Sequence, residues 1–217
     1  MVLARVGPPS TVIYGGGRAA GLHTVLPMPE LQLLRPDHAP ALLVFERDNR
    51  AYFAASVPDR GEDYFARFDE RHRALLAEQE AGDCYFHVLV GAAGEVLGRV
   101  NLVNVADGCA DLGYRMAERA TGRGLATAAV REVCGLAAGR YGLTALRVAA
   151  RLDNAASRAV LARTGFTLTG ETRLSGRPGL TFLRSLEDFS DRRSDGGGVV
   201  VLQGGGEEVA EGVGEEA

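Results

Sequence analysis

The sequence predicts an α/β (α+β) domain in which a mixed, mostly antiparallel central sheet is flanked by helices. Strand-like segments come first as an antiparallel meander and then alternate with helices, an order that favours a mixed sheet with helices on its faces. The chain has 217 residues, 46% of them hydrophobic, which is enough to build a core without disulfide bonds. The periodic patterns lie between residues 30 and 188, which we interpret as one domain.

The first half of this domain is expected to hold a strand, two helices and a three-stranded meander. The expected elements are a strand at 31–35, a helix capped by Asp37, a helix from Asp59 to about Glu80, and strands at 84–90, 96–105 and 110–116. Short turns join the last three strands, so we expect them to pair antiparallel. His72 falls on the apolar stripe of the second helix, where we expect a packing histidine rather than a ligand.

The second half of the domain alternates helices with strands. The expected elements are a helix from near Gly122 to Gly139 or Gly142, a strand at 145–150, a helix started by Asp153 or Asn154, and short strands at 166–168 and 180–186. Gly165 is expected to end the second of these helices, because glycine readily adopts the left-handed conformation that follows a helix.

Both ends of the chain differ from this domain in composition. Residues 1–29 are rich in glycine and proline, and we expect a loosely structured extension. Residues 189–217 are expected to form a disordered acidic tail. From Ser194 onward there are six acidic residues, eight glycines and no arginine, so little apolar surface is available for burial. The rest of the chain has a small positive balance, which is too weak to favour nucleic acid as a partner.

The basic residues exclude several classes of enzyme. All 24 of them are arginine, and no lysine is present. Schiff-base enzymes need a lysine amine that can lose its proton, and P-loop and kinase sites need a lysine on the phosphates. Three cysteines without CxxC spacing argue against a zinc site or a disulfide framework. No apolar run is long enough for a membrane helix, so we expect a cytoplasmic protein that does not bind membranes.

The most informative segment is the loop between the strand at 110–116 and the following helix. Gly122 and Gly124 stand where the helix begins, and Arg119 and Arg123 add positive charge. A helix N-terminus offers unpaired N–H groups to an anion, and glycine lets a phosphate approach them. The pattern favours a pyrophosphate cradle, although a helix start that merely needs glycine also fits it. A Rossmann fingerprint is excluded, because the third glycine is missing.

Three motifs resemble those of the GNAT superfamily of N-acetyltransferases, and of its ribosomal-protein-alanine N-acetyltransferase type in particular. The matching segments are Arg119-x-x-Gly122-x-Gly124-x-Ala126, Asp111 to Tyr114, and Asn154-x-x-Ser157 followed by Gly165-Phe166, with Asn101 to Val105 resembling the third strand. The resemblance covers about residues 30–188. It implies a sheet that splays open between the fourth and fifth strands, with the pantetheine arm of acetyl-CoA as co-substrate in the opening.

The resemblance also implies roles for individual residues. Backbone around Leu112, Tyr114 and Met116 would pair with pantetheine, and Asn154 would both cap its helix and reach the same arm. The residues that would hold the diphosphate are Thr121, Gly122, Arg123, Gly124, Leu125 and Ala126. No metal is implied.

The proton transfers are assigned to three side chains. Asp111 is the first candidate for the general base, although a carboxylate without a role fits that position equally well. Glu171 is the second candidate. Ser157 is the candidate acid, although a serine in the first turn of a helix needs no further explanation.

The expected activity is acetyl transfer from acetyl-CoA to a primary amine in a ternary complex. The first choice of acceptor is the N-terminal α-amine of a protein or peptide. A small-molecule amine, and a CoA-binding module without turnover, remain alternatives. Two departures bear on the acceptor: the segment from Gly170 to Leu180 is shorter than in the family, and the chain has no tryptophan. Either a monomer or a homodimer is compatible with the sequence.

Overall fold

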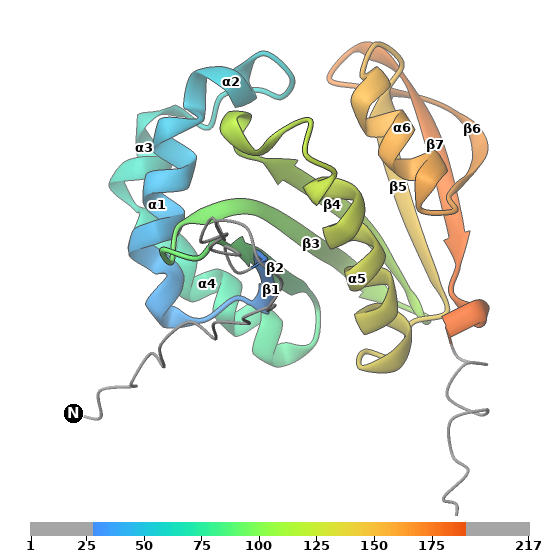
Figure 1. Ribbon diagram of the computed structural model, residues 1–217, viewed down its shortest axis with the longest axis horizontal. Helices are drawn as coiled ribbons and strands as arrows, with labels where there is room; N and C mark the ends of the chain where they lie inside the picture. Colours follow the sequence, from blue (N-terminus) through green and yellow to red (C-terminus); the bar gives the residue numbers. More distant parts are fainter. Residues whose placement is uncertain (1–27, 190–217) are drawn as a thin grey trace, which may run out of the picture.

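A seven-stranded sheet with the strand order β1-β2-β3-β4-β5-β7-β6 organises the molecule (Figure 1). The structure is a computed structural model that describes residues 28–189. The expected extension and acidic tail therefore lie almost wholly outside the described residues. The strands are β1 (Glu30–Leu33), β2 (Tyr85–Val90), β3 (Val96–Ala106), β4 (Cys109–Met116), β5 (Ala145–Arg151), β6 (Thr167–Leu174) and β7 (Arg177–Ser185).

The sheet is mixed and mostly antiparallel, as the sequence predicts. Only β4 and β5 run parallel, and all other neighbouring strands pair antiparallel. The expected meander of β2, β3 and β4 is confirmed. β6 and β7 are longer than expected and form a hairpin. The chain reverses at Ser175 and Gly176, which both have positive φ angles.

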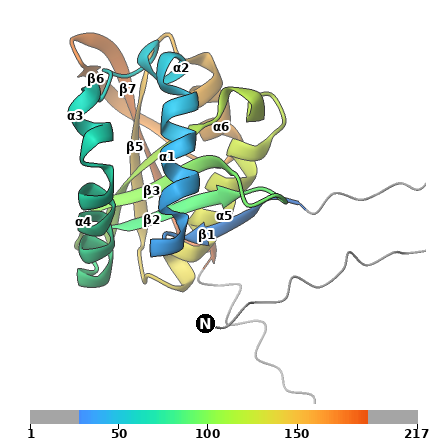
Figure 2. The ribbon, with the colours of Figure 1, turned by 90° about the vertical axis from the view of Figure 1, so that its left-hand side faces the viewer.

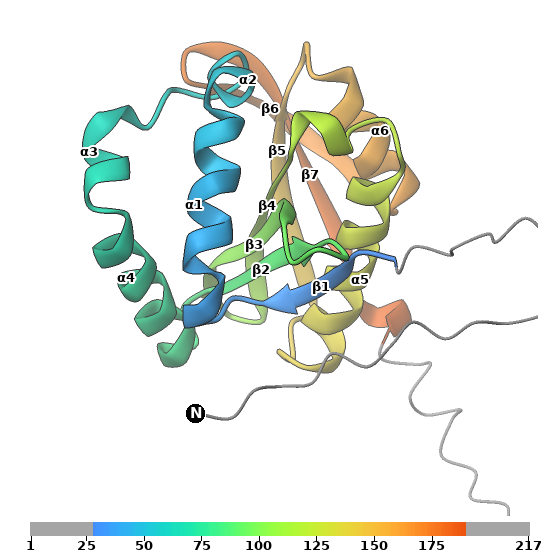
Figure 3. The ribbon, with the colours of Figure 1, turned by 60° about the vertical axis from the view of Figure 1, so that its left-hand side comes forward.

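Helices cover both faces of the sheet. They are α1 (Ala39–Asp48), α2 (Arg50–Ala54), α3 (Gly61–Ala66), α4 (Phe68–Ala81), α5 (Leu125–Gly139) and α6 (Ala155–Arg163), with short 3-10 helices at Pro36–His38 and Glu118–Ala120. Figures 2 and 3 show α1, α3 and α4 on one side of the sheet, and α5 and α6 on the other. We refer to these sides as the α1 face and the α5 face.

Three helix predictions need correction. The helix expected from Asp59 to Glu80 is two helices, α3 and α4, because the backbone of Arg67 leaves the helical region at φ −107° and ψ 28°. Asp37 does not cap α1; it lies inside a 3-10 turn and pairs with Arg35. The five-residue helix α2 is missing from the prediction, since it is too short to show a helical period.

The packing roles expected of several side chains are confirmed. His72 is buried, and its Nε2 lies 3.0 Å from the backbone oxygen of Arg35, so it packs the core. Leu161 of α6 is fully buried, as expected, and belongs to the same core as Leu102 and Val133. Among residues 28–189, no helix is both long and apolar enough to cross a bilayer.

The feature that positions the functional site is the opening between β4 and β5. Their parallel pairing covers only Cys109, Ala110 and Asp111, and it ends at the pair Asp111 and Arg147. Beyond that pair the strands diverge, as Figure 1 shows. The rest of β4 therefore keeps one edge without a strand partner, and its backbone groups on that edge are available to a ligand.

Candidate functional site

The loop that joins β4 to α5 has the glycine geometry expected of an anion cradle. Gly122 and Gly124 have φ angles of +72° and +75°, which delay the start of α5 to Leu125. A Cβ atom added at either glycine would meet no other atom within 4 Å, so open space lies above both. The first N–H groups of α5 have no acceptor within the helix and lie next to that space.

Two cavities meet along the open edge of β4. The first has a volume of about 550 Å³ and extends from the glycine loop past β4 to α2. The second has a volume of about 490 Å³ and lies between α2, β5 and the β6–β7 turn. Both are lined by Ser56, Val57, Gly113, Tyr114, Asn154 and Ser157. These six residues therefore form the junction between the two cavities.

Two hydroxyl groups and an amide are connected by hydrogen bonds at this junction. The Oη of Tyr114 lies 3.0 Å from the Oγ of Ser157 and also donates to the backbone oxygen of Ser157 at 3.3 Å. The Oδ1 of Asn154 accepts from the backbone N–H of Ser157 at 2.9 Å, which caps α6 as expected. Burial raises the pKa of Tyr114 above its usual value, so its phenol stays protonated near neutral pH.

Most of the predicted site residues come together around the two cavities. Leu112 lines the second cavity, and Tyr114, Asn154 and Ser157 line both. The remaining predicted residues that line the first cavity are Met116, Thr121, Gly122, Gly124, Leu125 and Ala126. Arg123 lies between the two glycines without lining either cavity. Arg119 lines a separate hollow with Glu95 and Glu118.

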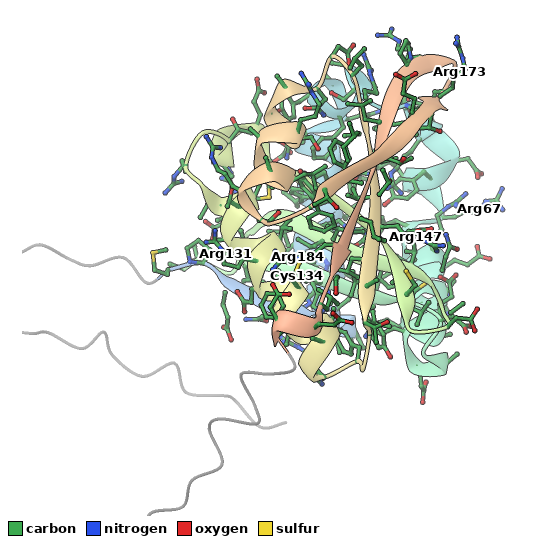
Figure 4. All side chains as sticks on the ribbon, turned by 90° about the vertical axis from the view of Figure 1, so that its right-hand side faces the viewer. Arg67, Arg131, Cys134, Arg147, Arg173 and Arg184 are labelled. Carbon is green, nitrogen blue, oxygen red and sulfur yellow. The ribbon has the colours of Figure 1, made fainter. Side chains whose placement is uncertain are left out.

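The two carboxylates predicted as bases lie elsewhere. Asp111 is at the closed end of the opening, where its Oδ1 accepts from Arg147 at 2.9 Å and its Oδ2 from Asn104 at 2.8 Å. Figure 4 labels Arg147, the partner of Asp111 on β5. Glu171 is exposed on β6, opposite Leu180. Neither carboxylate lines either of the two cavities.

A cluster of charges on the α1 face was missed by the sequence analysis. The carboxylate of Glu46 binds the Nη1 of Arg99 at 2.8 Å and the Nη1 of Arg115 at 3.1 Å, and both arginines line the first cavity. Arg99 and Arg115 are cross-strand partners on β3 and β4. Their proximity depends on the strand register, which the sequence did not predict. The tip of α2, with Tyr52 and Phe53, was missed for want of a helical signal.

Within the part of the chain that the structure describes, no three His, Cys, Asp or Glu side chains form a group that could hold a metal ion.

Comparison with protein families gives one match, to the family described as acetyltransferase (GNAT) domain, over residues 30–167. No protein of curated function matches the chain by sequence.

Solved structures share the fold. The ribosomal-protein-S5-alanine acetyltransferase from Vibrio fischeri is 19% identical with a TM-score of 0.71, and the match covers 75% of this chain and 96% of that one. RimJ from Mycobacterium smegmatis, solved with a CoA disulfide, is 25% identical with a TM-score of 0.66, covering 77% and 88%. The spermidine N-acetyltransferase SpeG from Vibrio cholerae is 12% identical with a TM-score of 0.62, covering 76% and 98%.

Proposed function

Because this chain belongs to the acetyltransferase (GNAT) domain family and is an acetyl-CoA-dependent N-acetyltransferase, we propose that it acetylates the N-terminal α-amine of a protein or peptide. The observation that carries the proposal is the junction at Tyr114 and Ser157, where two cavities meet beside an unpaired strand edge. One cavity leads to the glycine loop and suits the donor. The other opens toward α2 and the β6–β7 turn and suits the acceptor.

The residues of the first cavity fit coenzyme A. The open space above Gly122 and Gly124 is available to the diphosphate, and the N-terminus of α5 supplies N–H groups and a partial positive charge. The unpaired edge from Leu112 to Met116 can bind the amide groups of pantetheine as a strand would. The two cysteine-bearing relatives are not needed for this argument, since it rests on the backbone of this chain alone.

The transfer needs an uncharged amine, a held thioester and a proton for the departing thiolate. The amine nitrogen attacks the thioester carbonyl, a C–N bond forms and the C–S bond breaks. The sulfur then takes up one proton while the nitrogen loses one. The Tyr114–Ser157 pair supplies the proton to sulfur, because the phenol is held protonated by burial.

The lack of a carboxylate along the cavities favours an α-amine as the acceptor. Among the described residues that line the two cavities, none is Asp or Glu. An α-amine has a pKa of about 8, so a good fraction of it is already neutral near pH 7.5 and its proton can leave to water. A lysine-like or polyamine nitrogen has a pKa of about 10.4, so only about one molecule in a thousand is neutral there.

A thiol-release assay tests the proposal directly. Wild-type protein is mixed with acetyl-CoA and with peptides that have a free α-amine, the same peptides blocked at that amine, or spermidine. We expect release only with the free α-amine, and the acetyl group located there by mass spectrometry. Since the chain has no lysine, the protein itself contributes no acetylated side-chain amine. Release with spermidine but with no peptide would contradict the proposal, and donor binding without any release would indicate a binding module.

A further inference from the structure

The first cavity has a cationic wall that acetyl transfer to a simple amine does not use. The side chain of Glu46 is 2% exposed, and its two oxygens bind Arg99 at 2.8 Å and Arg115 at 3.1 Å. The Nε of Arg60 lies 3.8 Å from the same carboxylate. A single buried carboxylate therefore faces three guanidinium groups, and the cluster carries an excess of positive charge.

The two arginines that line the cavity have donors to spare. A guanidinium group carries five N–H donors, and within residues 28–189 only the Nη1 of Arg99 and the Nη1 of Arg115 have a side-chain acceptor. The side chain of Arg99 is 5% exposed and that of Arg115 26%. Burial, together with Arg60 and Arg99, lowers the pKa of Arg115 against the opposing effect of Glu46, as expected where positive charge is poorly compensated.

An unpaired acceptor atom lies in the same cavity. The Oδ1 of Asn101 is buried and has no hydrogen-bond partner within the described part of the chain. Asn101 lines the first cavity together with Arg99, two positions before it on β3. A buried amide oxygen without a donor is costly, so a ligand with an N–H group is the natural partner for it.

The wall lies on the side of β4 that is opposite to the glycine loop. Arg99 pairs with Arg115 and Asn101 with Gly113 across the strands, and alternate side chains of a strand share a face. Because Glu46 of α1 binds both arginines, this is the α1 face, whereas α5 and its glycine loop are on the other face (Figure 3). Donor phosphates at the loop would therefore be held away from the wall.

We propose that the acceptor carries an anionic group, a carboxylate or a phosphate, close to its amine, and that Arg99 and Arg115 bind this group while Asn101 accepts an N–H of the same molecule. The proposal rests on the proposed function and narrows it to an N-terminal segment with acidic residues next to the amine. The second cavity agrees in charge, since Arg151 and Arg177 are its only charged lining residues among those described.

Peptide binding to the CoA-saturated protein tests the proposal without requiring turnover. Three peptides differ only at their second and third positions, which are both Asp, both Asn or both phosphoserine. By calorimetry we expect one of the anionic peptides to bind at least about tenfold more tightly than the Asn peptide, as charge-assisted hydrogen bonds imply. The tighter of the two identifies the anion. Equal or weaker binding of both anionic peptides would overturn the proposal.

Variants of Arg115 assign the preference to the wall. In Arg115→Gln the preference should fall to about threefold or less, and Arg115→Lys should keep part of it, because lysine retains the charge without the planar fork. Arg67→Gln is the matched control. Arg67 projects outward at the edge of the molecule in Figure 4 and pairs only with Asp63 among the described carboxylates.

Three further outcomes are decisive. A preference that survives in Arg115→Gln would overturn the proposal. So would a loss of acetyl-CoA affinity in that variant with an unchanged peptide preference, because the wall would then serve a donor phosphate. Absence of thiol release with every peptide, alongside a preserved binding preference, would count against the proposed function and leave the anion site standing.

Discussion

At the scale of single residues, Tyr114 is the side chain on which the chemistry depends most. Its hydroxyl is bonded to that of Ser157 where the two cavities meet. The pKa of a phenol, about 10, is far closer to that of a thiol, about 8.5, than the pKa of an aliphatic hydroxyl is. Tyr114 is therefore the better proton donor to a departing thiolate, and Ser157 is better suited to orient it.

Replacing Tyr114 by Phe should lower kcat by about 100-fold and leave the Kd of acetyl-CoA nearly unchanged, because general-acid catalysis is lost while the backbone of β4 is kept. Ser157→Ala should lower kcat less. Steady-state kinetics and calorimetry measure both effects. A larger loss in Ser157→Ala than in Tyr114→Phe would identify the serine as the acid.

The raised pKa of Tyr114 also predicts the pH profile. The phenol stays protonated beyond pH 10, so kcat/KM should rise as the acceptor amine loses its proton and then remain level up to pH 9.5. A descending limb below pH 9 in the wild type, absent in Tyr114→Phe, would show that the phenol ionises within the working range.

Asp111→Asn should reduce kcat by no more than about threefold. The carboxylate is bound to Arg147 and Asn104 at the closed end of the opening, so it is not available to the amine. The control is Tyr114→Phe measured in the same assay. A loss comparable with that of the tyrosine variant, in a protein of unchanged melting temperature, would restore Asp111 as a base that acts through water.

His87 gives the fold a pH dependence. It is 1% exposed, bonded to the Oη of Tyr141 at 2.8 Å, and burial lowers its pKa to about 4. Its unfolded value is about 6.5, so the unfolded chain binds the proton first as the pH falls. The stability should be fully present above pH 6.5 and decline toward pH 4, by at most about 1.4 kcal/mol per pH unit from this group. In His87→Gln, urea unfolding across this range should show a smaller decline.

At the scale of elements, the glycine loop allows a matched pair of substitutions. Gly122→Val should abolish acetyl-CoA binding, because a branched side chain would fill the space above the loop. Gly142→Val is the control, since Gly142 has a similar φ of +67° and equally open surroundings but lines neither of the two cavities. Both variants should lose similar stability by thermal melting, and only the first should lose donor binding by calorimetry. Unchanged affinity in Gly122→Val would remove the loop from the donor site.

The sequence identified those elements whose local pattern is decisive. The glycine turn, the meander and the cap at Asn154 depend on neighbouring residues, and all were predicted. Contacts between distant segments were not predicted. The bond between Tyr114 and Ser157 spans 43 positions, and that between Glu46 and Arg115 spans 69. Both require knowledge of the register and of how a helix sits on the sheet, which no local pattern contains.

At the scale of the whole molecule, the lining of the two cavities comes from many segments between Tyr52 and Arg177. Shortening the chain after Ser194 should therefore leave kcat/KM within about twofold, as the composition of the acidic tail also suggests. The full chain is the control in the same assay. Loss of turnover with intact donor binding would show that the tail takes part in the reaction.

The divergence of β4 from β5 also has a kinetic consequence. Because the two mouths lie on different sides of one gap, neither reactant has to leave before the other arrives, and the kinetics should be sequential rather than ping-pong. Spent coenzyme would compete with its acetylated form alone. A bisubstrate conjugate, with the sulfur of one reactant tethered to the nitrogen of the other, would have to thread the gap and occupy both mouths at once.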